Sequence, residues 1–108
     1  MPQTHKVLGQ AAPAATTETV VYTAPAGTQA IVSTISICNR GPTTTYRIAV
    51  RPSGAALANQ HYLVFDGIAE VNVATFLTLG VSMGPTDVLS CYGAAATLSF
   101  SAFGVEIT

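Results

Sequence analysis

The side chains that could carry out chemistry are few in this chain of 108 residues. Its acids and histidines are Glu18, Asp66, Glu70, Asp87, Glu106, His5 and His61. Asp66 and Glu70 flank a predicted turn, and two neighbouring carboxylates are the minimal set for glycoside hydrolysis. Acids beside turns are far more often solvated, and Asp87, which follows Gly84-Pro85-Thr86, suits a turn by its residue type alone. A small hydrolase that uses Asp66 and Glu70 is therefore the weakest of the functions considered.

The two cysteines, Cys38 and Cys91, offer a second kind of chemistry. Either thiol could act as a nucleophile with His61 as its base, but no local motif of that kind surrounds them. A half-buried His61 beside Tyr62 is the simpler interpretation. Neither cysteine has a metal-ligating residue close in sequence, so we expect no metal site and no cofactor. Without a secretory signal, two reduced, half-buried thiols are expected rather than a disulfide.

Arg47 and Arg51 are half of the four basic side chains and occur in one alternating run, residues 45–51. In an extended strand they share one face, and Tyr46 lies on the other. Guanidinium groups can clamp carboxylates across an interface. Alternatively, they point into solvent and keep the strand from pairing with other chains. Because the surface offers so little other charge, we favour the interface, with Arg47, Arg51 and Tyr46 as candidates.

Composition excludes several partners. Charged residues make up only 8% of the chain, against about 25% in typical soluble proteins. A net charge of −1 and a pI near 6.0 argue against binding nucleic acid. No run approaches the ~20 apolar residues of a membrane span, and the first residues lack a secretory signal, so a cytoplasmic site of synthesis and assembly is expected. The low charge favours a protein that functions in an assembly; a threonine-rich soluble domain is the alternative.

Alternating runs supply the elements that must position these residues. They predict about eight short strands and no amphipathic helix: residues 1–10, 18–23, 29–38, 45–51, 59–65, 70–79, 88–92 and 97–107. The clearest region is 29–52, where two runs meet at Asn39-Arg40-Gly41-Pro42 and predict a β-hairpin. In its first run, one face is expected to hold Ile31, Ser33, Ile35 and Ile37. Asp66-Gly67 predicts a second tight turn, and Gly104 a bulge or close backbone approach.

Residues 1–16 are expected to form an N-terminal arm and linker, and residues 17–108 a single domain. Val7 and Leu8 are the only apolar anchors of the arm, and Pro13 disfavours a helix in the linker. Such an arm can pack on its own domain as a strand or reach a neighbouring subunit, and both alternatives stay open. Val7 and Leu8 are therefore further interface candidates.

The number and spacing of the runs predict an all-β fold. Without crossover helices the strands are expected to pair antiparallel, which favours a β-sandwich of the jelly-roll type. An immunoglobulin-like sandwich is the second choice, because the chain contains no tryptophan of the kind those domains bury.

Several stretches resemble small β-sandwich virion proteins of tailed bacteriophages. They are the turn T-x-P-A-G-T at 23–28, C-N-R at 38–40, R-x-A-V-R-P at 47–52 and T-D-V-L-S at 86–90. The resemblance covers most of the chain after about residue 16. It implies a structural protein without enzymatic activity, cofactor or small-molecule substrate. Such proteins decorate or cement the capsid exterior and bind the major capsid protein, and a homotrimer would be expected.

A second function in the same class of virion proteins stays open. Tail- and fibre-associated modules contact host surface glycans, and sugar sites usually stack aromatic rings on the ligand. The candidates for such stacking are Tyr22, Tyr46, Tyr62 and Tyr92.

Overall fold

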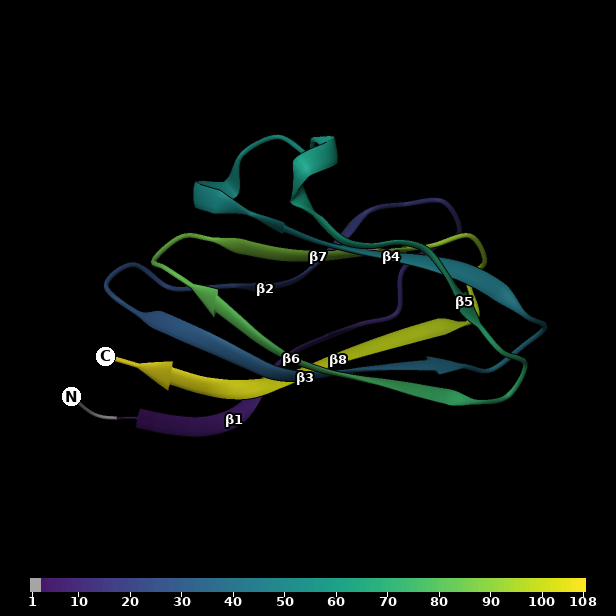
Figure 1. Cartoon of the computed structure of the whole chain (residues 1–108), viewed down its shortest axis with the longest axis horizontal. Coiled ribbons are helices and arrows are strands. Elements are labelled where there is room, and N and C mark those ends of the chain that lie inside the picture. The colour runs from purple at the N-terminus through teal and green to yellow at the C-terminus, as the bar shows by residue number, and fades with distance from the viewer. Residues whose placement is uncertain (1–2) are drawn as a thin grey trace.

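Eight strands build two antiparallel sheets that pack face to face (Figure 1). This computed structural model describes residues 3–108. The strands are β1 (Gln3–Ala11), β2 (Thr19–Thr23), β3 (Gln29–Asn39), β4 (Thr44–Arg51), β5 (Tyr62–Ala69), β6 (Ala74–Met83), β7 (Val88–Gly93) and β8 (Leu98–Ile107). Two single-turn 3₁₀ helices, η1 (Pro52–Gly54) and η2 (Asn59–His61), lie between β4 and β5. The all-β prediction is confirmed.

The strand order identifies the sandwich as a jelly roll. One sheet, called sheet A, has the order β1-β8-β3-β6, and the other, sheet B, has the order β2-β7-β4-β5. The pairs β1/β8, β2/β7, β3/β6 and β4/β5 are nested along the chain and alternate between the sheets. This nesting is what folding one long hairpin into two layers produces, and it confirms the predicted architecture.

The predicted hairpin at 29–52 is wrong, although both of its strands exist. β3 lies in sheet A and β4 in sheet B, so the turn between them crosses from one layer to the other (Figure 1). Asn39, only 1% exposed, holds this corner. Its Nδ2 donates to the carbonyl oxygens of Pro42, Ala69 and Glu70, and its Oδ1 accepts from the Gly41 N–H and the Thr97 hydroxyl. Asn39 therefore fixes a change of sheet instead of a tight hairpin.

A bulge changes which residues of β3 face the core. The pairing register shifts between Val32 and Thr34, so the alternation reverses there. Ile35 and Ile37 are buried as expected, but Ile31 is 38% exposed and Val32 takes the inner face. Beside this bulge the expectation for Gly104 is confirmed. A Cβ there would lie 1.9 Å from the Ile31 carbonyl oxygen.

The tight turn predicted at Asp66-Gly67 is also wrong, because both residues lie inside β5. Asp66 has φ of 55°, a left-handed conformation that Asp tolerates, and the β4–β5 register shifts there. Gly67 is required by close packing, since a Cβ would lie 2.7 Å from Val64 Cγ1 and 3.0 Å from the Tyr46 ring. The segment is a bulged strand, and the chain reverses only after Ala69.

The segment predicted as an arm forms an edge strand of its own domain. β1 pairs with β8 from Gln3 opposite Ile107 to Ala11 opposite Phe100. Leu8 is 8% exposed and belongs to the core. Of the two alternatives for this segment, packing on its own domain is the one observed for residues 3–11; residues 1 and 2 lie outside the described part of the chain.

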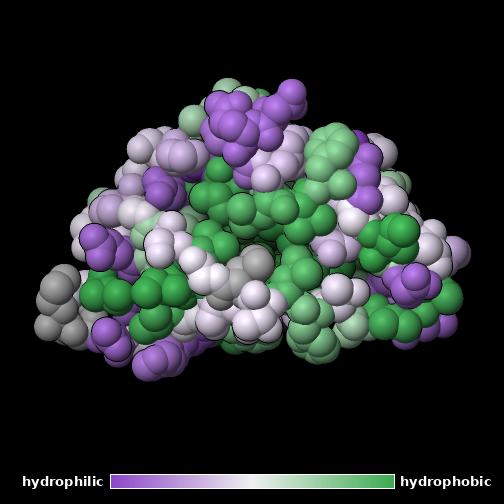
Figure 2. All heavy atoms as spheres, in the orientation of Figure 1, coloured by the Kyte–Doolittle hydropathy of each residue, from purple (hydrophilic) through white to green (hydrophobic). Residues whose placement is uncertain are grey.

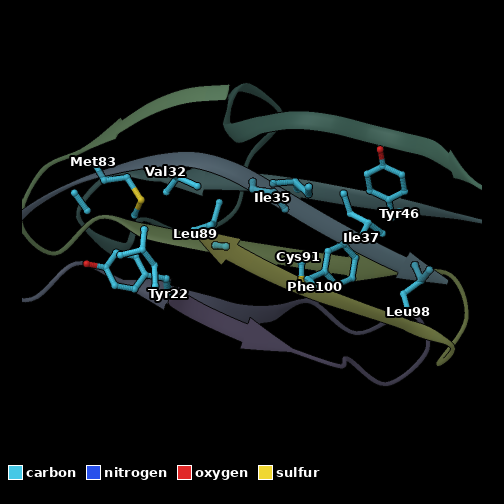
Figure 3. Close-up of a cluster of buried hydrophobic side chains, with 14 of the residues drawn as sticks. Tyr22, Val32, Ile35, Ile37, Tyr46, Met83, Leu89, Cys91, Leu98 and Phe100 are labelled. Atoms are coloured by element: carbon cyan, nitrogen blue, oxygen red, sulfur yellow. The ribbon is translucent and has the colours of Figure 1, made fainter. Parts of the chain in front are cut away.

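The core lies between the sheets and interleaves side chains from both (Figure 3). Its largest side chains are each at most 2% exposed: Phe100, Ile37, Ile48, Met83, Leu89 and Leu98. Tyr46 meets Phe100 edge to face, with ring centroids 6.3 Å apart. Within residues 3–108 no helix has the length and hydropathy needed to cross a membrane.

Candidate interaction surfaces

Arg47 is the centre of a cluster on the outer face of sheet B. Its Nε donates to Asp66 Oδ1 at 2.7 Å, and its Nη2 lies 3.5 Å from Asp66 Oδ2. The guanidinium carbon lies 4.1 Å from the centre of the Phe65 ring and 4.5 Å from that of Tyr92. The hydrogen bond to Asp66 raises the pKa of Arg47 further, so the group stays charged. Arg47 therefore fixes the β5 bulge from outside the sheet.

Arg51 holds the connection between β4 and β5 against sheet B. Its Nη1 donates to the Ala55 carbonyl at 3.2 Å, and its Nε lies 3.7 Å from Glu18 Oε2. The same Glu18 oxygen accepts from the Ser90 hydroxyl at 2.7 Å. Both candidate arginines thus already have partners within the chain.

The space beneath this connection is too small for an organic ligand. The cavity is lined by Glu18, Arg47, Ala49, Leu57, Tyr62, Ser90, Cys91 and Tyr92 and has a volume of ≈ 20 Å³. A single water needs roughly 10–15 Å³. Nothing larger than a water or two fits there.

Most of the acids and thiols considered above are hydrogen-bonded to other groups of the chain or buried. Asp66 is bound by Arg47, and Asp87 accepts from the backbone N–H groups of Ser53 and Gly84, as its turn position predicts. Cys38 is exposed and Cys91 buried, and both are free. Burial raises the pKa of the Cys91 thiol to about 12, which suppresses the reactive thiolate. His61 Nδ1 accepts from the Ala58 N–H rather than from a thiol.

Within residues 3–108 the candidate catalytic groups are engaged in other contacts: Asp66 binds Arg47, and His61 Nδ1 accepts from the Ala58 N–H. No group of three or more His, Cys, Asp or Glu side chains in this part of the chain could hold a metal ion. Of the tyrosines considered for sugar stacking, Tyr22 and Tyr46 are buried in the core. Burial and a hydrogen bond to Glu106 raise the pKa of Tyr22. Tyr62 and Tyr92 remain near the surface, where Arg47 covers the Tyr92 ring.

The remaining interface candidates divide between surface and core. Val7 on β1 is 47% exposed, whereas Leu8 and Tyr46 are buried. Neither buried side chain can reach a partner while the sandwich is intact, so of these three only Val7 is accessible.

An apolar surface that the sequence did not indicate lies on one side of the sandwich. It consists of six side chains that are each about half exposed or more, here called the apolar edge: Leu63, Phe65, Ile68, Val71, Val73 and Phe76. Phe76 is 65% and Ile68 64% exposed. Figure 2 shows hydrophobic side chains in the middle and toward the right of the visible face, over the region where Figure 1 places β5 and β6.

The fold explains why these side chains gather. β5 is the last strand of sheet B and β6 the last strand of sheet A, and only residues 70–73 separate them. Both unpaired strand edges therefore lie on the same side. β5 and β6 alternate like ordinary half-buried strands. Val64 and Leu77 pack against the core, so Phe65 faces outward from sheet B and Phe76 outward from sheet A, where no further layer covers them.

Comparison of the chain with family models, with curated proteins and with solved structures gave no match. The resemblance to phage virion proteins therefore stays a prediction from the sequence.

Proposed function

We propose that this chain is a non-enzymatic structural protein of a tailed-phage virion. In this proposal it is assembled in the host cytoplasm, decorates the exterior of the capsid and cements neighbouring subunits of the major capsid protein. The observation that carries the proposal is the apolar edge. A patch of this kind on a protein with so few charges marks a surface that another protein covers.

Two further observations support a structural role. Cys91 is buried in the core, and His61 and Asp66 are engaged in hydrogen bonds within the chain. The jelly roll is also an architecture of viral capsid proteins, although lectins and cupins share it. Since one fold serves many functions, the architecture alone is compatible with the proposal and does not decide it.

A cement protein works by adding buried area between subunits. Each bridge must be broken before two capsid subunits can separate, so the bound protein raises the stability of the shell. A compact β-sandwich fits this task because it presents rigid faces and loses little conformational freedom on binding.

Reconstitution on capsids tests the proposal. Purified protein is added to phage capsids that lack it, and binding is measured by co-sedimentation together with the melting temperature of the shell. We expect saturable binding and a higher melting temperature. Absence of binding at micromolar protein, or binding that leaves the shell's melting temperature unchanged, would refute the cement function.

A tail- or fibre-associated glycan-binding module is the second candidate, and one observation favours it. Asn59, Tyr62 and Phe65 line a shallow hollow, and the Phe65 ring is 57% exposed. An amide beside open aromatic rings can both stack on a sugar and hydrogen-bond to it. A glycan array separates the candidates: hits that disappear in Phe65→Ala but persist in Phe76→Ala would favour this function, and an array without hits would remove it.

A further inference from the structure

The β6 edge provides a surface suited to a second copy of this chain. Among the described strands, β6 pairs only with β3, so its outer row of backbone N–H and C=O groups has no strand beside it. Edge strands usually carry charges or proline that prevent pairing with other chains. β6 has the sequence ATFLTLGVSM and contains neither.

Over half of its length, β6 is a regular strand without a bulge. From Ala74 opposite Cys38 to Thr78 opposite Thr34, β6 follows β3 without a register shift. The shift comes after Thr78, so the segment Ala74–Thr78 is the regular, uncharged part of the edge. Phe76 is its central residue.

β5, the neighbouring edge strand of sheet B, is protected against pairing with another chain, whereas β6 is not. Asp66 forms the bulge in β5, and Arg47 holds it there. A bulge with a charge at its tip prevents an added strand from following β5. The side chains of β5 remain available for packing, but strand pairing is left to β6.

Part of the exposed apolar surface lies where such a dimer would form. Phe76, 65% exposed, and Val73, 48% exposed, lie in and beside the β6 edge, whereas Leu63, Phe65 and Ile68 face outward from sheet B. The contact would therefore consist mainly of backbone pairing, with Phe76 against its counterpart.

We propose that this chain forms a two-fold dimer in which Ala74–Thr78 pairs antiparallel with the same segment of a second copy, with Phe76 opposite its own counterpart. A two-fold axis brings identical surfaces together, and an apolar, uncharged strand is compatible with itself. Sheet A then continues across the axis as eight strands.

This dimer deepens the proposed function and rests on it for its biological meaning. The dimer covers the β6 part of the apolar edge and leaves Leu63, Phe65 and Ile68, on the outer face of sheet B, for the capsid. Two copies joined back to back present two such faces and can bridge neighbouring capsid subunits. Linkage also raises the apparent affinity, because the second contact becomes intramolecular. The trimer implied by the sequence resemblance would need a different contact.

Sedimentation velocity on the full chain tests the dimer. We expect the wild type to sediment as a dimer at micromolar concentration and Phe76→Lys to dissociate at least tenfold more readily, since lysine at 65% exposure is tolerated in the monomer but not beside its copy. Thr78→Lys, also at an exposed position, gives an independent variant if Phe76→Lys fails to fold. Val7→Lys, on the opposite edge of sheet A, is the matched control and should remain dimeric.

Two measurements test the strand pairing itself. Those amides of residues 74–78 that point away from β3 should exchange slowly in the wild-type dimer and rapidly in Phe76→Lys, whereas the amides bonded to β3 should be protected in both. Phe76→Cys in a Cys38→Ser background should form a covalent dimer under mild oxidation by diamide. A monomer or trimer, equal exchange in both proteins, or no covalent dimer would overturn the proposal. Capsid binding is measured separately: a dimer that does not bind capsids would refute the cement function and leave the dimer intact.

Discussion

Asn39 is the residue on which the change of sheet between β3 and β4 depends. It is buried, and its amide links the ends of three connections through five hydrogen-bond partners. Its role was not evident from the sequence, because Asn-Arg-Gly-Pro is equally typical of a hairpin turn, and two of its partners lie 30 and 58 residues away.

Removing this amide should be costly. We expect Asn39→Ala to lower the free energy of unfolding by about 3 kcal/mol, because several buried polar groups lose their partners at once. Urea denaturation followed by circular dichroism measures the change. Asn59→Ala, at an exposed position, is the control and should change stability by less than about 0.5 kcal/mol. Similar losses in the two variants would contradict the role of Asn39.

Glu106 gives the fold a specific acid sensitivity. Its Oε2 accepts from the Tyr22 hydroxyl at 2.6 Å and its Oε1 lies 3.2 Å from Lys6 Nζ. The hydrogen bond from Tyr22 is the main cause of the lowered pKa of Glu106. A carboxyl whose pKa is lower in the folded state stabilises the fold above its unfolded pKa, about 4.3, and this contribution disappears as the pH falls through the folded pKa.

The melting temperature should therefore fall more steeply below about pH 4.3 in the wild type than in Glu106→Gln, which cannot titrate at this position. Between pH 5 and 7 the wild type should be the more stable of the two. Parallel melting curves for the two proteins between pH 3 and 7 would show that Glu106 does not contribute. Because its side chain is partly exposed, added salt should reduce the difference.

At the scale of the elements, most strand positions could be predicted, but their partners and some of their faces could not. The strands predicted at 59–65 and 70–79 lie three or four residues later, at 62–69 and 74–83. Alternation located β2, β7 and β8 within one or two residues. It failed at the bulges, because the shift near Ser33 reverses the faces of β3 and Asp66 lets β5 continue through an apparent turn. Bulges are imposed by contacts between strands that are distant in sequence, such as Ile31 against Gly104.

That close approach makes a prediction about glycine. A methyl group at position 104 would lie 1.9 Å from the Ile31 carbonyl oxygen, whereas one at Gly80 would have no atom within 4 Å. We expect Gly104→Ala to destabilise the protein by about 3 kcal/mol and Gly80→Ala to be close to neutral. Thermal melting of the pair measures the difference, and a stable Gly104→Ala variant would mean that β3 and β8 can separate at little cost.

For the candidate surfaces too, the sequence predicted which residues share a face but not which residues they contact. Alternation placed Arg47 and Arg51 on one face, opposite Tyr46, as observed. It could not show that Asp66 and Glu18 occupy the two arginines, because these acids come from other strands and connections. The apolar edge was missed for a related reason: alternation shows two faces of a strand, but only the fold shows which face is outward, as for Phe65 and Phe76, and which strands end the sheets.

For the whole molecule, the nesting of the strands makes β8 indispensable. It lies between β1 and β3 and pairs with both, so sheet A is divided without it. A chain that ends after Ala96 should be unfolded and rapidly cleaved by protease, whereas removal of Thr108, which lies outside β8, should have no effect. Limited proteolysis with thermolysin distinguishes the two, and a protease-resistant short chain would show that the remaining strands fold alone.

The central place of β8 also has a consequence for how the protein is made. During synthesis β1 and β3 leave the ribosome long before residues 98–107. Until then β3 lacks its neighbour on one side, and β1 has no strand to pair with in sheet A. The nascent chain therefore exposes unpaired strand edges, a condition in which chains aggregate. Sheet A can be completed only after β8 has been translated, so until then folding in the cell should depend on how well the growing chain is shielded by chaperones.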